Sequence, residues 1–239
     1  MTPERFSKKK KVEAMGNTMD LLEAIKARHS VRSFTDKIIE GEIESSLQET
    51  VDECNRESGL NIQVCLNEPN AFSGMRAHYG KFENCKNYIA LIGKAGTDEK
   101  CGYYGERLVL KAQQLGLNSC WVAMTYNKSK APCILNKGEK IQLVIALGYG
   151  NTSGKPHKSK DMMQLCKVEG EMADWFKKGM EAAMLAPTAM NQQKFVLTQS
   201  GNTVSAKPLA AFYSKIDIGI VKYHFEIGAG KDTFDWKEE

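Results

Sequence analysis

The amino-acid sequence predicts an α+β protein, in which helices are mixed with strands that are partly parallel and partly hairpin-paired. Two observations support this class. Apolar residues recur at helical spacing in several segments, and short runs of strand length lie between those segments. The chain has 239 residues, of which 42% are hydrophobic, so it contains enough apolar material for a sizeable core.

Three helices are predicted in the first half of the chain. The first begins at Asp20, which forms a capping-box pattern with Glu23. Apolar residues at helical spacing mark the second helix over 43–54 and the third over 104–115. Gly59 ends the second helix, because glycine adopts the left-handed conformation of a helix C-terminus without strain.

Four strands are predicted among these helices. Residues 61–66 alternate apolar and polar side chains, as a half-buried strand does. Residues 87–92, 118–124 and 141–150 are short apolar runs, which are typical of strands buried on both faces.

The second half is predicted to contain two helices and a hairpin. One helix covers the apolar residues of 172–183, and a final helix starts near Asp217. Between them, residues 194–199 and 203–207 flank the turn sequence Ser-Gly-Asn, which predicts a β-hairpin.

Two segments of the first half are echoed in the same order in the second half. EGEI at 40–43 and EGEM at 169–172 each open an amphipathic helix. Residues 105–116 resemble residues 219–230, with glycines eleven positions apart in both. The repeated order predicts an internal duplication that imitates a dimer within one chain.

The predicted domain organisation follows from this repeat and from composition. Residues 1–18, with a basic run at Lys8 to Lys11, are predicted to form a flexible tail. Residues 19–239 are predicted to form the folded domain, with pseudo-repeats at about 19–160 and 161–239.

Composition limits the possible partners. The net charge of +4 is too small to indicate a nucleic-acid binder, and no apolar run has the length of a membrane span. The seven scattered cysteines form no C-x-x-C pair and the four histidines no H-x-x-x-H pair, so we expect no metal site. Unpaired thiols of this kind favour a reduced protein in the cytoplasm.

Hydrogen-bond donors are concentrated where the first predicted helix stops, at Arg28, His29, Ser30 and Arg32. In an extended segment, residues 28, 30 and 32 project to one side, where two guanidinium groups and a hydroxyl suit a phosphate. The alternative is a solvated helix C-terminus, where the helix dipole alone favours cations. The segment itself leaves both interpretations open.

Two later loops carry polar side chains with a similar ambiguity. Residues 154–160, GKPHKSK, form either a second anion contact or a plain surface loop. Residues 186–193, APTAMNQQ, offer a hydroxyl and three amides, either to a heteroaromatic ring or to their own backbone in a turn. Side chains that suit either a planar pocket or the core are Tyr103, Tyr104, Cys120 and Trp121.

These segments together resemble the flavin-dependent nitroreductase superfamily over about residues 19–200. LLEAIKARHSVRSF is similar to the family's N-terminal helix that ends in R-x-S-x-R, and APTAMNQQKF to its A-P-S-x-x-N-x-Q-P-W-x-F segment. KAQQLGLNSCWV and LVIALGYG with KPHKSK resemble its remaining motifs. The branch called putative TM nitroreductases is the most similar. The chain departs from the family in having Lys194 in place of a proline, and some 155 residues between its first and last motifs.

The resemblance implies a sandwich with a mostly antiparallel sheet flanked by helices and a noncovalently bound FMN. Family dimers build two flavin sites across their interface, whereas each half of this chain retains one side of a site, which implies one FMN per chain. By motif position, the residues implied at the phosphate and ribityl end are Arg28, His29, Ser30, Arg32, Lys158 and Lys160. Those implied at the isoalloxazine ring are Pro187, Thr188, Ala189, Asn191 and Gln192.

The resemblance also implies an activity, the ping-pong reduction of a nitroaromatic, quinone or similar acceptor by NAD(P)H, with no catalytic acid or base assigned to the protein. Two alternatives stay open: a flavin-binding or carrier protein without significant turnover, and a flavin-dependent reductase of another substrate class. We expect a monomer with pseudo-two-fold symmetry or a weak homodimer.

Overall fold

The computed structural model describes residues 19–237 and confirms the α+β class. The predicted basic tail of residues 1–18 lies outside the described residues. The described helices are α2 (Leu21–Ala27), α3 (Glu42–Ser58), α4 (Met75–Tyr79), α5 (Asp98–Gln114), α6 (Asp174–Ala183) and α7 (Ser214–Ala229). The strands are β1 (Gln63–Cys65), β2 (Asn87–Gly93), β3 (Asn118–Val122), β4 (Lys140–Gly148), β5 (Cys166–Glu169), β6 (Phe195–Ser200), β7 (Thr203–Pro208) and β8 (Asp235–Trp236).

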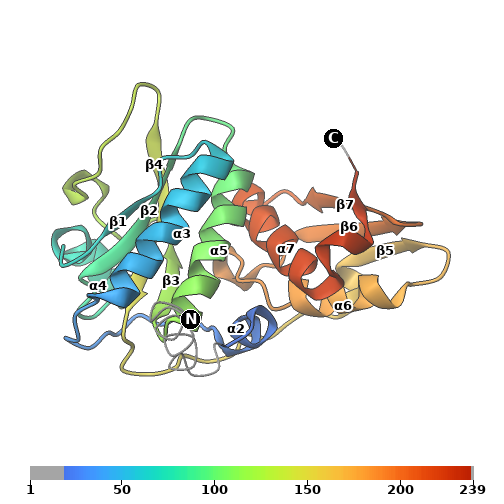
Figure 1. The fold of residues 1–239 in the computed structure, drawn as a ribbon, viewed down its shortest axis with the longest axis horizontal. Helices are drawn as coiled ribbons and strands as arrows, with labels where there is room; N and C mark the ends of the chain where they lie inside the picture. Colours follow the sequence, from blue (N-terminus) through green and yellow to red (C-terminus); the bar gives the residue numbers. More distant parts are fainter. Residues whose placement is uncertain (1–18, 238–239) are drawn as a thin grey trace, which may run out of the picture.

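The first sheet contains the four strands that the sequence predicts in the first half, in the order β1-β2-β4-β3 and entirely antiparallel. Helices α3 and α5 cover one of its faces (Figure 1). On β2, Ile89 and Leu91 pack toward those helices, while Tyr88 and Ala90 belong to a second core on the other face. The strand is therefore buried on both faces, which explains its uninterrupted apolar sequence.

The second sheet has the order β5-β6-β7-β8 and lies beside α6 and α7 (Figure 1). Its centre is the predicted hairpin of β6 and β7. The flanking strands β5 and β8 pair in parallel with the hairpin, and the sequence analysis predicts neither of them. The antiparallel strands of the protein are thus divided between two sheets.

Helices α5 and α7 run side by side and join the two halves of the molecule (Figure 1). Their backbones approach closely at Gly102 and Gly219, where a Cβ atom on either glycine would collide with the backbone of the other helix. One hydrophobic core runs across this contact and includes residues of both sheets. The elements that hold the site described below are therefore fixed to one another.

The order of helices and strands agrees in part with the predicted duplication. When the short helix α4 between β1 and β2 is left aside, the order helix, strand, strand and helix occurs in α3, β1, β2, α5 and again in α6, β6, β7, α7. The two units differ in their remaining strands, since β3 and β4 extend the first sheet and β5 and β8 flank the second. The duplication and its boundaries remain a prediction.

Candidate functional site

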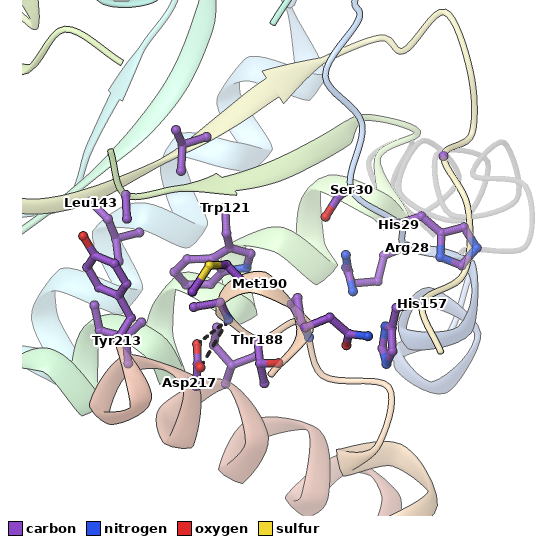
Figure 2. Close-up of a pocket in the computed structure, with 18 of the residues that line it drawn as sticks. Arg28, His29, Ser30, Trp121, Leu143, His157, Thr188, Met190, Tyr213 and Asp217 are labelled. Atoms are coloured by element: carbon purple, nitrogen blue, oxygen red, sulfur yellow. Dashed lines mark hydrogen bonds between the residues drawn. The ribbon is translucent and has the colours of Figure 1, made fainter. Parts of the chain in front are cut away.

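A pocket of about 570 Å³ lies where the two halves of the chain meet (Figure 2). Its wall combines the segment after α2, strands β3 and β4, the loop before β5, the loop after α6, and the first turns of α7. The lining residues are Arg28, His29, Ser30, Arg32, Trp121, Val122, Ala123, Leu143, Gly154, Lys155, His157, Pro187, Thr188, Ala189, Met190, Asn191, Tyr213, Ile216, Asp217 and Ile220.

The segment after α2 forms the first wall of the pocket. Helix α2 ends because Arg28 adopts an extended backbone conformation, with φ −73° and ψ 128°. The chain then runs parallel to the start of β3, with the N–H of Val31 donating to the carbonyl of Ser119 at 3.0 Å. Val31 is buried in the core, while the predicted Arg28, His29, Ser30 and Arg32 line the pocket.

Arg28 is the most buried cation of this wall, with an exposed fraction of 5%. Its Nε atom lies 4.0 Å from Oε1 of Glu106, which is too far for a hydrogen bond. Among the residues that the structure describes, this Nε is the one buried side-chain nitrogen or oxygen without a hydrogen-bond partner. A buried donor without a partner is rare in native proteins, and here it belongs to a side chain that lines a pocket.

The loop before β5 approaches the first wall at Gly154, where a Cβ atom would lie 2.7 Å from the Cβ of His29. This approach brings Lys155 and His157 to the pocket. Burial is the main cause that lowers the pKa of His29, and the nearby Arg28 and His157 lower it further. Figure 2 shows Arg28 together with His29 and His157 at one end of the pocket, which is called the cationic end below.

The predicted Lys158 and Lys160 are not among the lining residues. The ammonium of Lys160 donates to the carbonyls of Gln192 and Gln193, at 2.6 and 3.1 Å. The carbonyl of Lys158 accepts hydrogen bonds from the Asn191 and Gln193 amides. These two lysines thus fasten one loop to the other instead of facing the pocket, and Lys155 and His157 occupy the positions at its wall.

The loop after α6 forms the opposite wall, with the predicted Pro187, Thr188, Ala189 and Asn191 lining the pocket. Its amides are largely engaged within the protein. Gln192 is not among the lining residues, because its amide donates to the carbonyl of Phe212 at 2.6 Å. The bonds hold the loop in an unusual backbone path, with positive φ at Met190, Asn191 and Gln193.

Asp217 of α7 fixes this loop from inside the pocket. Its carboxylate accepts the backbone N–H of Ala189 at 3.0 and 3.2 Å, drawn as dashed lines in Figure 2. Burial raises the pKa of Asp217 to about 6, although the hydrogen bonds from Ala189 and Gln192 oppose the shift. The sequence marks Asp217 only as a helix start, and nothing in its spacing distinguishes it from a capping residue.

The other end of the pocket is largely apolar. Figure 2 shows Leu143 and Tyr213 at that end, with Trp121 and Met190 between them and the cationic end. The sequence leaves open whether Trp121 lines a pocket or belongs to the core, and in the structure it lines the pocket. Its neighbour Cys120 is buried in the core, and Tyr103 and Tyr104 do not line the pocket. Within residues 19–237, no cluster of three or more potential metal ligands occurs.

The sequence matches the family described as Putative TM nitroreductase over residues 20–229. The match spans most of the chain, so the protein belongs to this family. No curated protein matches the chain.

The fold is similar to that of a protein from Thermotoga maritima described as a putative nitroreductase, at 19% identity and a TM-score of 0.65. That similarity covers 93% of this chain and 89% of the other. A nitroreductase family protein from Streptococcus pneumoniae matches 61% of this chain and 98% of its own, at 16% identity and a TM-score of 0.47. A protein from Desulfovibrio desulfuricans described as a putative nitroreductase, solved in complex with FMN, matches 61% of this chain and 94% of its own, at 17% identity and a TM-score of 0.47.

Proposed function

We propose that this protein is an FMN-dependent oxidoreductase that binds one FMN in the pocket between its two halves. The observation that carries the proposal is the buried guanidinium of Arg28, whose Nε lacks a hydrogen-bond acceptor at the cationic end of a pocket whose other end is largely apolar. Membership of the nitroreductase family supports the proposal independently.

The residues of the pocket fit the two chemically different ends of FMN. Arg28 and Arg32 would hold the phosphate, with Ser30 as a further donor and Lys155 as an exposed cation at the rim. Leu143, Trp121, Ile216 and Ile220 would pack against the apolar ring system at the other end. The volume of about 570 Å³ lies within the range of about 300–1,000 Å³ that is usual for sites of this kind.

The protein supplies binding, orientation and electrostatics in this proposal, whereas FMN when bound supplies the capacity to accept and release a hydride. Asp217 holds the loop of residues 187–191 against the pocket through the Ala189 N–H. The side-chain amide of Asn191 donates to the carbonyl of Lys158, which leaves its Oδ1 to Gln193. Asn191 shapes the wall through these two bonds, and the second N–H of its amide is left for the proposed contact with the flavin ring.

NAD(P)H as the reductant, and a nitroaromatic, quinone or similar acceptor, are the partners that we propose for the activity. The pocket draws its wall from both halves of the chain, which supports one FMN per chain and a site complete within a monomer. All seven cysteines are free thiols, which is compatible with the proposed cytoplasmic location. Within the described residues, no helix has the combination of length and apolar character that crossing a bilayer requires.

An absorbance spectrum of the purified protein tests the cofactor, and anaerobic mixing tests the activity. We expect flavin absorbance in the visible range after reconstitution with FMN and removal of excess. Addition of NADH or NADPH should then bleach this absorbance within seconds, and a quinone should restore it. A protein that retains no FMN contradicts the proposal. One that retains FMN and is not bleached by either nicotinamide supports the flavin-carrier alternative.

A further inference from the structure

A carboxylate lies next to Arg28 and could cancel the positive charge that Arg28 offers to an anion. Glu106 of α5 is fully buried, with an exposed fraction of 0%, and its Oε1 lies 4.0 Å from the Arg28 Nε. If Glu106 simply neutralised Arg28, the pair would carry no net charge and would attract an anion only weakly. Whether Glu106 neutralises Arg28 depends on the other side chains that contact the Glu106 carboxylate.

Those partners come from two other elements. The indole N–H of Trp121 on β3 donates to Oε2 of Glu106 at 2.9 Å. The Nε2 atom of His224 on α7, a side chain with no exposed surface, lies 2.8 Å from Oε1. Both carboxylate oxygens are therefore within hydrogen-bond distance of another donor, while Arg28 stands outside that distance.

The second nitrogen of His224 contacts the backbone of α6. Nδ1 lies 3.1 Å from the carbonyl oxygen of Ala182 on α6. A carbonyl oxygen can only accept, so Nδ1 carries a proton. Nε2 faces a carboxylate that also accepts from Trp121 and lies 4.0 Å from the guanidinium of Arg28, so both of these neighbours present positive charge to it. With this carboxylate ionised, a doubly protonated imidazole satisfies both contacts of His224; the alternative form places the proton on Glu106 and leaves Nε2 as its acceptor.

We infer that His224 is an imidazolium that pairs with the Glu106 carboxylate, so that the positive charge of Arg28 remains available to an anion in the pocket. The charges of Arg28, Glu106 and His224 sum to +1. His224 is therefore a positioning residue, which acts on the ligand through Glu106 and Arg28 without lining the pocket. The identification of the anion as the FMN phosphate rests on the proposed function.

Two substitutions distinguish this inference from a purely structural role of His224 in the packing of the core. Glu106→Gln retains an acceptor for Trp121 and a donor for His224, so His224 loses one proton and the cluster keeps its charge of +1. His224→Gln retains an amide donor toward Glu106 but removes the proton, so the cluster of Arg28 and Glu106 falls to zero. The two variants thus remove one member of the same pair with different effects on net charge.

The first experiment is a fluorescence titration of wild type and both variants with FMN and with riboflavin, which lacks the phosphate. The ratio of the two dissociation constants isolates the phosphate contribution. We expect His224→Gln to reduce the preference for FMN about tenfold, because one unit of charge near the phosphate is lost. Glu106→Gln should change the ratio less than about threefold. An equal loss in both variants would overturn the inference.

The second experiment reads the proton directly and requires no flavin. Proton–nitrogen NMR of protein labelled with 15N-histidine, with His224 assigned by substitution, should find both ring nitrogens of His224 protonated in the wild type. In Glu106→Gln, Nε2 should lose its proton. An unprotonated Nε2 in the wild type overturns the inference even if FMN binds. A protein that binds no FMN but has the imidazolium contradicts the proposed function and leaves the charge assignment standing.

Discussion

Replacing Gly105 with alanine would add a methyl group where helix α5 packs against Trp121, a residue of the pocket wall. A Cβ atom at this position would lie 2.5 Å from the Cη2 atom of Trp121 and 2.7 Å from the Cδ1 atom of Leu91. Contacts this short force the neighbours to move. Because Trp121 both lines the pocket and donates to Glu106, its displacement links a packing change to the site.

The expected cost combines two opposing contributions. Overpacking a core of this kind costs about 1–3 kcal/mol, whereas alanine is favoured over glycine in a helix by about 0.5–1 kcal/mol. We expect Gly105→Ala to lower the free energy of unfolding by about 1–2 kcal/mol and the Tm by about 2–8 °C. Binding of FMN should weaken as well, since the indole no longer occupies its position in the wall.

Urea denaturation and flavin titration of Gly105→Ala, Trp121→Phe and the double variant form the assay. Phenylalanine lacks the Cη2 atom, so the alanine should cost less in the Trp121→Phe background than in the wild type. If the changes in the free energy of unfolding of the two single variants simply add in the double variant, Trp121 does not make the close contact with α5. A Gly105→Ala protein that is more stable than the wild type and binds FMN normally would also refute that contact.

Three further predictions concern single side chains. Arg28→Ala should weaken FMN binding about 10- to 100-fold in a fluorescence titration, because a charge-assisted bond of about 1.5–3 kcal/mol is lost; unchanged affinity would contradict a contact between Arg28 and the phosphate. Since burial raises the pKa of Asp217 from 3.8 to about 6, its contribution to stability is present near pH 4 and is lost as the pH rises through 6. Denaturation should therefore find wild type losing stability relative to Asp217→Asn between pH 4 and 7, and a constant difference would contradict the buried carboxyl. The hydrogen bond from Cys133 lowers the pKa of Cys65 to about 7, so limited iodoacetamide at pH 7.5 should modify Cys65 first, and Cys133→Ala should slow that reaction; mass spectrometry of the alkylated peptides checks the order.

The elements with strong local signals were predictable from the sequence. The capping box of α2 forms both of its hydrogen bonds, between Glu23 N–H and Asp20 at 2.8 Å and between Asp20 N–H and Glu23 at 3.1 Å. Gly59 ends α3 in the left-handed conformation. Both signals act within a few residues, so they require no knowledge of tertiary contacts.

The missed elements owe their structure to distant neighbours. Strand β8 contains two residues, Asp235 and Trp236, and is defined by its pairing with β7. Strand β5, Cys166–Glu169, has no clear alternation, and its parallel partner β6 lies some thirty residues later. Pairing of this kind is a tertiary property that no local pattern in the sequence encodes.

The site was predictable where residue type and motif agree, as at Arg28 and in the loop that contains Ala189. The loop of residues 154–160 carries the same kind of side chain at four positions, and only the close approach at Gly154 selects Lys155 and His157 for the pocket. Glu106 and His224 lie in helices whose spacing predicts only an amphipathic face. Their pairing arises from the contact between α5 and α7, which sequence spacing does not define.

The most direct measurement of the central claim is the stoichiometry of FMN binding to the full chain. Titration of flavin-free protein with FMN, followed by fluorescence quenching and checked by equilibrium dialysis, gives the number of sites and their affinity. Because the cationic end of the pocket comes from the first half of the chain and the opposite wall from the second half, we predict one FMN per chain, with its affinity reduced in Arg28→Ala. Two equivalent FMN per chain, or no saturable binding, would contradict the account.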